Sequence, residues 1–249
     1  MGLADALVEL QELTERLRRE CPWDREQTAQ TIVPHTVEEA YEVADAAFAQ
    51  DDAKLLDELG DLLFQAYFLA LLLQERGTGD LEQVARGVHA KLVRRHPHVF
   101  GDVQADSAER VRSNWEQIKI DQEGREGIFH DVAETLPATL YARKMQQRAK
   151  AAGFEYPDVA GAYADLHEEL RELEADWSAG ELGDVLFAAV NVARKLDVDP
   201  ELELRAAAKR FRARVETADA LARADGKDWS TLPLVEQDAY FDRAKEDET

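Results

Sequence analysis

A pattern of closely spaced carboxylates occurs twice in this chain and constrains its fold more than any other feature. Residues 38–42 read Glu-Glu-Ala-Tyr-Glu, and residues 58–64 read Glu-Leu-Gly-Asp-Leu-Leu-Phe. Residues 168–172 and 181–187 repeat both parts, as Glu-Glu-Leu-Arg-Glu and Glu-Leu-Gly-Asp-Val-Leu-Phe. Self-similarity of this kind indicates a duplicated structural unit. We therefore expect the chain to consist of two related halves.

The sequence around these motifs is helical in character. It is rich in Ala, Leu, Glu, Arg and Gln, and its apolar residues recur at helical spacing, with no segment that alternates like a strand. We predict an all-α fold of two tandem helical-bundle domains, residues 1–125 and 130–249, with a polar linker at residues 121–130. Helices are expected near residues 3–20, 35–50, 52–76, 80–95, 107–123, 137–151, 158–176, 180–196, 200–224 and 234–247, with breaks at residues such as Pro22, Pro34, Pro97 and Pro200.

The spacing of the carboxylates points to a cation. On a helix, Glu38 and Glu39 lie one turn from Glu42, and Glu58 stacks on Asp61, so like charges would crowd one face. Carboxylates from two antiparallel helices repel each other unless a divalent cation lies between them. Oxygen-only ligands favour Mg²⁺ or Mn²⁺ over zinc. The same pattern also arises on a solvated helix in so acidic a chain, and a purely structural acidic bundle remains an alternative.

Three features favour the metal-site interpretation. The acidic residues of the second motif stand among apolar ones in both copies, so they adjoin a core. Gly60 and Gly183 occupy the same mid-helix place, where glycine costs about 1 kcal/mol relative to alanine. The duplication supplies a second instance of the whole spacing. A di-iron carboxylate bundle is disfavoured, because none of the six histidines follows a glutamate by three residues.

Composition excludes several classes of partner. Acidic residues outnumber basic ones 52 to 30, and the net charge of -22 disfavours a nucleic acid polymer. The longest apolar run is too short to span a membrane, and the start of the chain does not read as a signal peptide. A single cysteine, Cys21, excludes an internal disulfide. We expect a cytoplasmic protein.

A triphosphate would have to be held by metal and by basic side chains on helices, because the chain has no Gly-rich phosphate-binding loop. Each half carries a basic pair spaced by one helical turn, Lys91 with Arg95 and Arg210 with Arg214. The guanidinium fork of arginine suits phosphate oxygens. Both pairs are candidate substrate-binding residues. A solvated basic stripe is the alternative.

At this point the sequence resembles the MazG family of nucleoside triphosphate pyrophosphohydrolases, in its tandem-domain bacterial form. Besides the carboxylate motifs, the residues that carry the resemblance are Cys21-Pro-Trp-Asp24 with Gln27-Thr28, Arg94-Arg-His-Pro-His-Val-Phe100, and Asn114-Trp115-Glu116 with Lys119. The resemblance implies a homodimer with carboxylate-lined, four-helix-type metal sites. It also implies Mg²⁺-dependent hydrolysis of a nucleoside triphosphate to the monophosphate and pyrophosphate, an activity suited to cleaning the nucleotide pool.

The family's functional residues carry over to both halves. In the first half the implied metal ligands are Glu39, Glu42, Glu58 and Asp61, with Glu38 beside them. In the second half they are Glu169, Glu172, Glu181 and Asp184. These four are also the candidate catalytic residues together with Glu168, which could orient or deprotonate the attacking water.

The second half is the expected catalyst. Asn191 lies seven residues after Asp184, on the same helix face, and the matching residue of the first half is Phe68. An amide extends the site as a candidate substrate contact, whereas phenylalanine narrows it. The short connection at residues 176–180 argues against this choice, since it replaces a stretch that supplies a lysine in relatives. A non-catalytic nucleotide-binding regulatory module, with one or both sites silent, is the alternative function.

Overall fold

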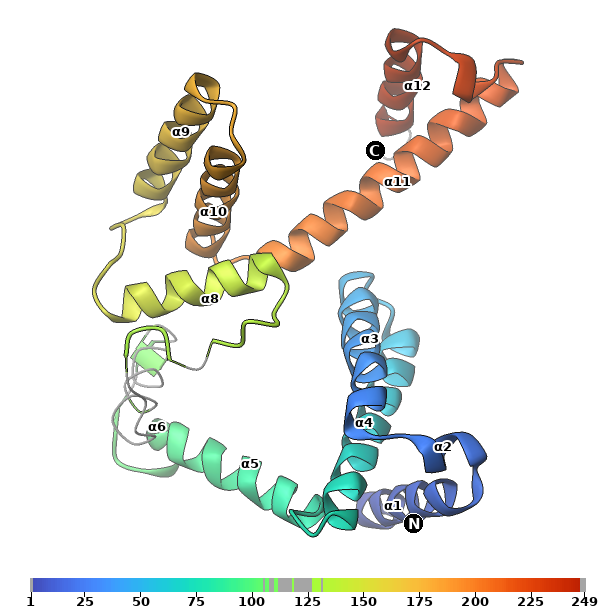
Figure 1. Cartoon of the computed structure of the whole chain (residues 1–249), viewed down its shortest axis with the longest axis vertical. Helices are drawn as coiled ribbons and strands as arrows, with labels where there is room; N and C mark the ends of the chain where they lie inside the picture. Colours follow the sequence, from blue (N-terminus) through green and yellow to red (C-terminus); the bar gives the residue numbers. More distant parts are fainter. Residues whose placement is uncertain are drawn as a thin grey trace. The chain divides into compact units, whose positions relative to one another are not determined.

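The computed structural model of the chain contains only helices among the residues that it describes, which confirms the all-α prediction (Figure 1). None of these helices is both long and apolar enough to cross a bilayer. Contacts divide the chain into two compact units, Met1–Ile118 and Lys119–Thr249. The boundary adjoins the linker expected at residues 121–130, most of which lies outside the described part. The described residues are 2–104, 106, 107, 110, 111, 118, 127–130 and 132–246.

The first unit is built around a hairpin of two long helices, α3 and α4, which lie side by side (Figure 1). Helix α1 packs against α4, and α5 follows at its far end. The side chains of Ile32, Phe68 and Leu72 are buried together where α3 meets α4. The helices of this unit are α1 (Leu3–Glu20), α2 (Pro22–Glu26), α3 (Ala29–Phe48), α4 (Asp52–Glu75), α5 (Leu81–Arg95) and α6 (Pro97–Phe100).

Helix α3 begins earlier than predicted, at Ala29, so the break expected at Pro34 is wrong. The proline lies inside the helix near its start, where the missing amide removes one hydrogen bond. Two interactions outweigh that loss. The Thr28 side chain accepts a hydrogen bond from the amide of Thr31 at 3.2 Å, which caps the helix. The following turn then buries Ile32, which is only 1% exposed.

One arginine ties the N-terminal segment to the hairpin. The guanidinium of Arg18 donates to both oxygens of Glu75 at 2.8 and 2.9 Å, and it also donates to the backbone carbonyls of Asp24 and Gln27. It lies over the ring of Phe68 as well, 5.8 Å from the ring centroid. A single side chain thus joins α1, the end of α2 and the C-terminal end of α4.

The second unit contains two helical hairpins, α9 with α10 and α11 with α12 (Figure 1). Helix α8 packs against α10 and against the start of α11. Side-chain caps define where the first hairpin starts, since Asp158 accepts from the amide of Gly161 and Ser178 from that of Glu181. The helices of this unit are α8 (Ala138–Ala151), α9 (Val159–Ala175), α10 (Ala179–Lys195), α11 (Pro200–Ala224), η1 (Trp229–Thr231) and α12 (Leu234–Glu246).

A partly buried ion pair anchors the connection between α8 and α9 to the end of α10. Both oxygens of Glu155 accept hydrogen bonds from Arg194, at 2.7 and 2.8 Å, and Lys195 lies 3.0 Å from the same carboxylate. The hydrogen bonds from Arg194 lower the pKa of Glu155, whereas burial raises it. The hydrogen bonds have the larger effect, so the pKa falls to about 2. The connection is therefore held by charge as well as by packing.

We predict that Glu155→Gln lowers the free energy of unfolding by about 2 kcal/mol at pH 7, because it leaves Arg194 partly unpaired. The pKa of Glu155 in the folded protein lies below its ordinary value of 4.5. The stability that its carboxylate contributes is therefore complete above pH 4.5 and is lost as the pH falls toward about 2. Denaturant titrations followed by circular dichroism at pH 7 and pH 3 measure the difference. The exposed pair Arg16–Glu20 provides the control, since Glu20→Gln should change stability by less than about 0.5 kcal/mol.

Candidate functional site

The carboxylates of the first repeat come together across the α3/α4 hairpin. Glu39 of α3 and both Glu58 and Asp61 of α4 each place an oxygen within 4.8 Å of the others. Glu58 is buried, with 8% of its surface exposed. Glu42, one turn after Glu39, is hydrogen-bonded to it. The structure thus brings together all four metal-ligand candidates of this half.

Crowding and burial shift the acidity of this group. Burial raises the pKa of Glu39, and the charges of Asp61 and Glu42 raise it further. Burial also raises the pKa of Glu58, and Glu42 adds to that effect, while Lys54 one turn away opposes it. In the absence of a cation, both side chains are held in an environment that disfavours their charged form.

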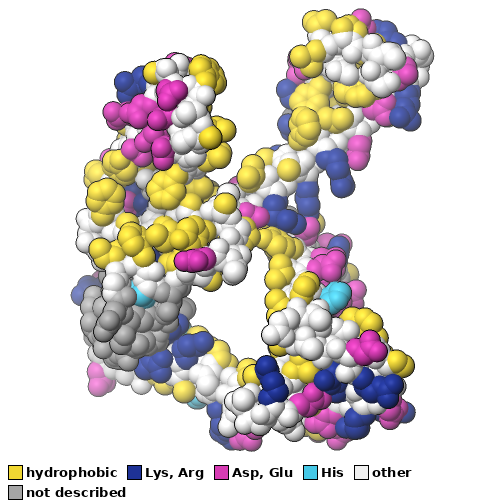
Figure 2. All heavy atoms as spheres, in the orientation of Figure 1, with side chains coloured by type: hydrophobic (Ala, Val, Ile, Leu, Met, Phe, Trp, Pro, Cys, Tyr) yellow, Lys and Arg dark blue, Asp and Glu magenta, His cyan; other side chains and the backbone are white. Residues whose placement is uncertain are grey.

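The second repeat forms the matching group across the α9/α10 hairpin. Glu169 and Glu172 of α9 and Glu181 of α10 place oxygens within 4.8 Å of one another. Burial raises the pKa of Glu169, and the charges of Glu172 and Asp184 add to it. Figure 2 shows acidic side chains gathered over α9. Three of the four ligand candidates of the second half therefore lie together, and the charge of the fourth, Asp184, acts on Glu169.

These groups have the chemistry of a divalent-cation site. Each offers several carboxylate oxygens, which are the ligands that hard divalent ions prefer, and neither group contains a sulfur or imidazole donor. Glu58 is buried, and Glu39, Glu169 and Glu181 are partly buried, which separates these four carboxylates from the exposed acidic surface of this chain. Asp61 and Glu172 are exposed. The carboxylate clusters are compatible with a divalent metal.

Glu168, which is proposed to orient or deprotonate water, and its counterpart Glu38 lie beside these groups and are exposed. Glu168 precedes Glu169 on α9, and its charge acts on the hydroxyl of Tyr156. Glu38 stands in the same place on α3, where its carboxylate lies 3.7 Å from Nδ1 of His35. Their exposure leaves both side chains accessible to solvent water.

The residues predicted to distinguish the halves are both buried, and each has a structural partner. Phe68 is fully buried between α3 and α4. Asn191 is 8% exposed, and its Oδ1 accepts hydrogen bonds from Nε and Nη2 of Arg194 at 3.1 and 2.6 Å. The amide oxygen that was expected to face substrate is thus already held by an arginine of its own helix.

The basic pairs lie on other helices than the carboxylates. Lys91 and Arg95 belong to α5, and Arg210 and Arg214 belong to the middle of α11. The main charged influences on Glu39, Glu58 and Glu169 come from neighbouring carboxylates and Lys54. The motif at residues 114–116 and Lys119 lie outside the described residues.

Sequence reasoning missed Asp165, a fifth carboxylate of the second group. It lies one turn before Glu169 on α9, and its charge contributes to the raised pKa of that residue. The hydroxyl of Tyr156 donates to Asp165 Oδ1 at 2.6 Å. The four-residue spacing to Glu169 was the available signal, but the contact with Tyr156 depends on how the preceding loop folds.

Comparison with known proteins agrees with this geometry. Residues 27–100 match the MazG nucleotide pyrophosphohydrolase domain. The chain is 38% identical over 245 residues to the nucleoside triphosphate pyrophosphohydrolase/pyrophosphatase MazG of Thermotoga maritima, covering 95% of this chain and 94% of that protein. It is 36% identical over 260 residues to the nucleoside triphosphate pyrophosphohydrolase of Escherichia coli, covering 100% and 99% respectively.

A crystal structure of a mazG-related protein from Thermotoga maritima is 32% identical, with a TM-score of 0.40, and the match covers 45% of this chain and 97% of that one. The full-length relatives and the matched domain bear out the resemblance that the motifs suggested. The chain, with its repeated carboxylate hairpins, belongs to the MazG pyrophosphohydrolase family.

Proposed function

We propose that this protein hydrolyses nucleoside triphosphates to the monophosphate and pyrophosphate with the help of Mg²⁺, and that it acts in the cytoplasm. The observation that carries the proposal is the carboxylate group that each half assembles across its central hairpin. Relatives named as nucleoside triphosphate pyrophosphohydrolases support it, because they match this chain over nearly its full length. A nucleotide-pool cleaning role follows from that chemistry.

In the second half, Glu169, Glu172, Glu181 and Asp184 would hold the cation. Their oxygens suit Mg²⁺, and Mn²⁺ is the nearest substitute. Bound there, the ion would neutralise phosphate oxygens and make a water molecule more acidic. In the first half, Glu39, Glu42, Glu58 and Asp61 offer the same set.

Glu168 is the proposed general base. Its exposed carboxylate stands next to Glu169, where it could accept a proton from the attacking water. If Glu168 only orients this water, its substitution should lower the rate of hydrolysis by a smaller factor. As the water oxygen bonds to phosphorus, the phosphoanhydride bond would break and pyrophosphate would leave, and basic side chains and the bound cation would balance its charge.

We assign the main catalytic role to the second half. Phe68 fills the first hairpin completely at the position where the second carries Asn191, so the second hairpin has a polar interior. The Asn191 amide is a polar group on α10, although its oxygen is held by Arg194. The alternative function, a regulatory module that binds nucleotide without turnover, would apply if either half were silent.

We propose that two copies of the chain assemble as a homodimer. Each hairpin leaves apolar side chains exposed at matching positions, Leu59 and Leu63 on α4 and Leu182 and Leu186 on α10. Exposed apolar surface of this kind is typical of an interface. Pairing two hairpins would complete the four-helix-type site expected for this family. It would also allow a basic pair, such as Arg210 and Arg214 on α11, to reach the carboxylates of a second copy.

We predict that Glu172→Gln lowers the rate of pyrophosphate release at least 100-fold, because it removes one charge from the ligand set. The equivalent change in the first half, Glu42→Gln, should lower it less than about threefold. Pyrophosphate and orthophosphate are measured separately across a panel of nucleoside triphosphates. Equal losses in both variants would refute the assignment to the second half, and release of orthophosphate alone would refute the proposed reaction.

We predict that Mg²⁺ or Mn²⁺ raises the melting temperature at pH 7, because the cation offsets repulsion within each carboxylate group. A chelator should reverse the rise and abolish pyrophosphate release. Differential scanning calorimetry with MgCl₂, and with KCl at equal ionic strength as the control, separates specific binding from screening. A rise of the same size in both salts would count against a metal site.

We predict that Leu186→Arg converts a dimer into a monomer, because it places a charge in the proposed interface. Analytical ultracentrifugation at micromolar concentration measures the mass. Leu3→Arg is the matched control, since Leu3 is also exposed but lies at the start of α1, which belongs to neither hairpin. A wild-type protein that sediments as a monomer would contradict the homodimer.

A further inference from the structure

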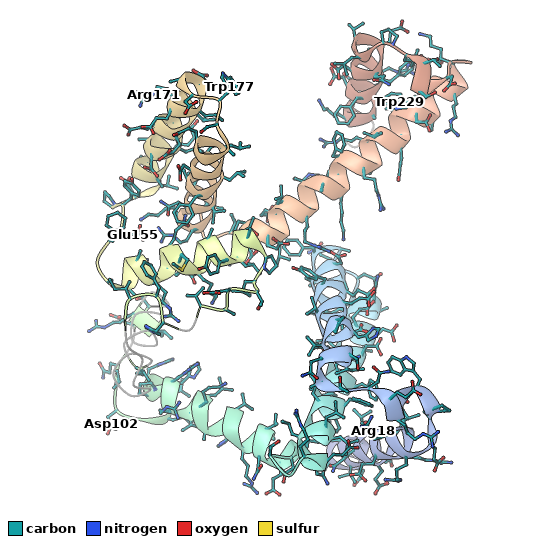
Figure 3. The ribbon with its side chains drawn as sticks, viewed as in Figure 1. Arg18, Asp102, Glu155, Arg171, Trp177 and Trp229 are labelled. Carbon is teal, nitrogen blue, oxygen red and sulfur yellow. The ribbon has the colours of Figure 1, made fainter. Side chains whose placement is uncertain are left out.

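The segment before α9, residues 154–157, is fixed to α10 by ionic contacts. Glu155 lies in the connection between α8 and α9 (Figure 3). Its carboxylate pairs with Arg194, whose side chain is only 8% exposed. Lys195 pairs with the Glu155 carboxylate and also donates to the backbone carbonyl of Tyr156. The backbone on both sides of the bond between Glu155 and Tyr156 is therefore held in place, which determines where the tyrosine ring can lie.

The ring of Tyr156 packs against α9 at Gly161, where the helix has no side chain. A Cβ atom added at Gly161 would lie 3.2 Å from Cδ1 and 3.4 Å from Cβ of Tyr156, closer than ordinary van der Waals contact. Glycine at this position therefore lets the ring lie against the helix. One turn further along α9, the Tyr156 hydroxyl donates to Asp165 Oδ1 at 2.6 Å. This is a short, charge-assisted hydrogen bond that restricts the carboxylate to one orientation.

Asp165 belongs to the electrostatic environment of the second carboxylate group. It stands one turn before Glu169 on the same face of α9, and its carboxylate accepts the hydrogen bond from Tyr156. Asp165 is itself only partly exposed. A carboxylate whose orientation is already fixed can act on a bound cation, or on water around it, without losing further side-chain entropy.

The first half lacks this arrangement. Aligning Glu38 with Glu168 puts His35 opposite Asp165. The His35 ring meets the edge of Trp23, with 5.7 Å between ring centroids, and its Nδ1 lies 3.7 Å from Glu38. At the position before its carboxylate group, the first half therefore has an imidazole where the second half has a carboxylate. The two repeats differ by one negative charge at the same place on the same helix face.

We propose that Asp165, oriented by Tyr156, is a positioning residue of the second site that strengthens its hold on the divalent cation. The inference rests on the proposed function, since it concerns the same cation. Its physical basis is an added negative charge held near the metal ligands, which attracts a doubly charged ion and can hydrogen-bond water in its coordination shell. The second half should consequently bind a divalent cation more tightly than the first.

The test uses Mn²⁺ alone as the probe, so it does not depend on turnover. In the full chain carrying Glu42→Gln, free Mn²⁺ is followed by electron paramagnetic resonance during titration. Asp165→Asn and Tyr156→Phe should each weaken binding to the second site by about tenfold. Gly161→Ala should act in the same direction as Tyr156→Phe, because the added Cβ pushes the ring away from α9.

Tyr240→Phe is the matched control. The Tyr240 hydroxyl also donates to an aspartate, Asp225 Oδ2 at 2.9 Å, but at the α11/α12 hairpin. Removing it should leave Mn²⁺ affinity unchanged even if it costs stability. Asp165→Asn keeps an acceptor for the tyrosine, so it removes the charge with little effect on folding, which circular dichroism verifies.

Activity supplies a second readout, because the Mg²⁺ concentration that the enzyme needs and the turnover rate at saturating Mg²⁺ can be measured separately. In Asp165→Asn, the Mg²⁺ concentration for half-maximal pyrophosphate release should rise about tenfold, while kcat at saturating Mg²⁺ recovers to within about threefold. Unchanged Mn²⁺ affinity in folded Asp165→Asn and Tyr156→Phe proteins would overturn the proposal. A wild-type chain that releases no pyrophosphate would contradict the proposed function instead, whereas the Mn²⁺ titration would still decide the role of Asp165.

Discussion

Repulsion between carboxylates is the constraint on which the arrangement of both halves depends. Glu39 and Glu58 in one unit, and Glu169 and Glu181 in the other, face each other across two helices that must pack to form a core. Burial raises the pKa of Glu39, Glu58 and Glu169 because ionisation there is disfavoured without a compensating charge. Apolar packing has to overcome this cost in the free protein, and a divalent cation would remove it.

Each half fastens its hairpin with an arginine that makes a two-oxygen contact to a glutamate. In the first unit, Arg18 of α1 binds Glu75 at the end of α4. In the second, Arg194 of α10 binds Glu155 in the connection that precedes α9. The two clamps come from different elements, so the duplicated hairpins are supported in different ways. The residues outside the hairpins can therefore differ between the halves while both hairpins keep the same arrangement of carboxylates.

That freedom has consequences for the site. The pair between Glu155 and Arg194 holds the segment that carries Tyr156, whose hydroxyl donates to Asp165 on α9. The guanidinium of Arg18 instead lies over the ring of the buried Phe68. One repeat thus acquires a polar surround and the other an apolar one. This contrast supports the proposal that the second half is the main catalyst of this MazG protein.

The sequence by itself determined the helical class, most helix boundaries and which carboxylates share a helix face, because helical periodicity and i, i+4 spacing are local properties. It misjudged Pro34, since only the burial of Ile32 against α4 shows why α3 can begin before it. Only the tertiary structure revealed that Arg194 occupies the Asn191 amide oxygen and that Tyr156 orients Asp165. The first contact joins residues one helical turn apart and the second joins residues nine apart, so neither is distant in the chain. Both depend on side-chain orientations that are set by the Arg194–Glu155 pair, whose partners are 39 residues apart and which no local pattern encodes.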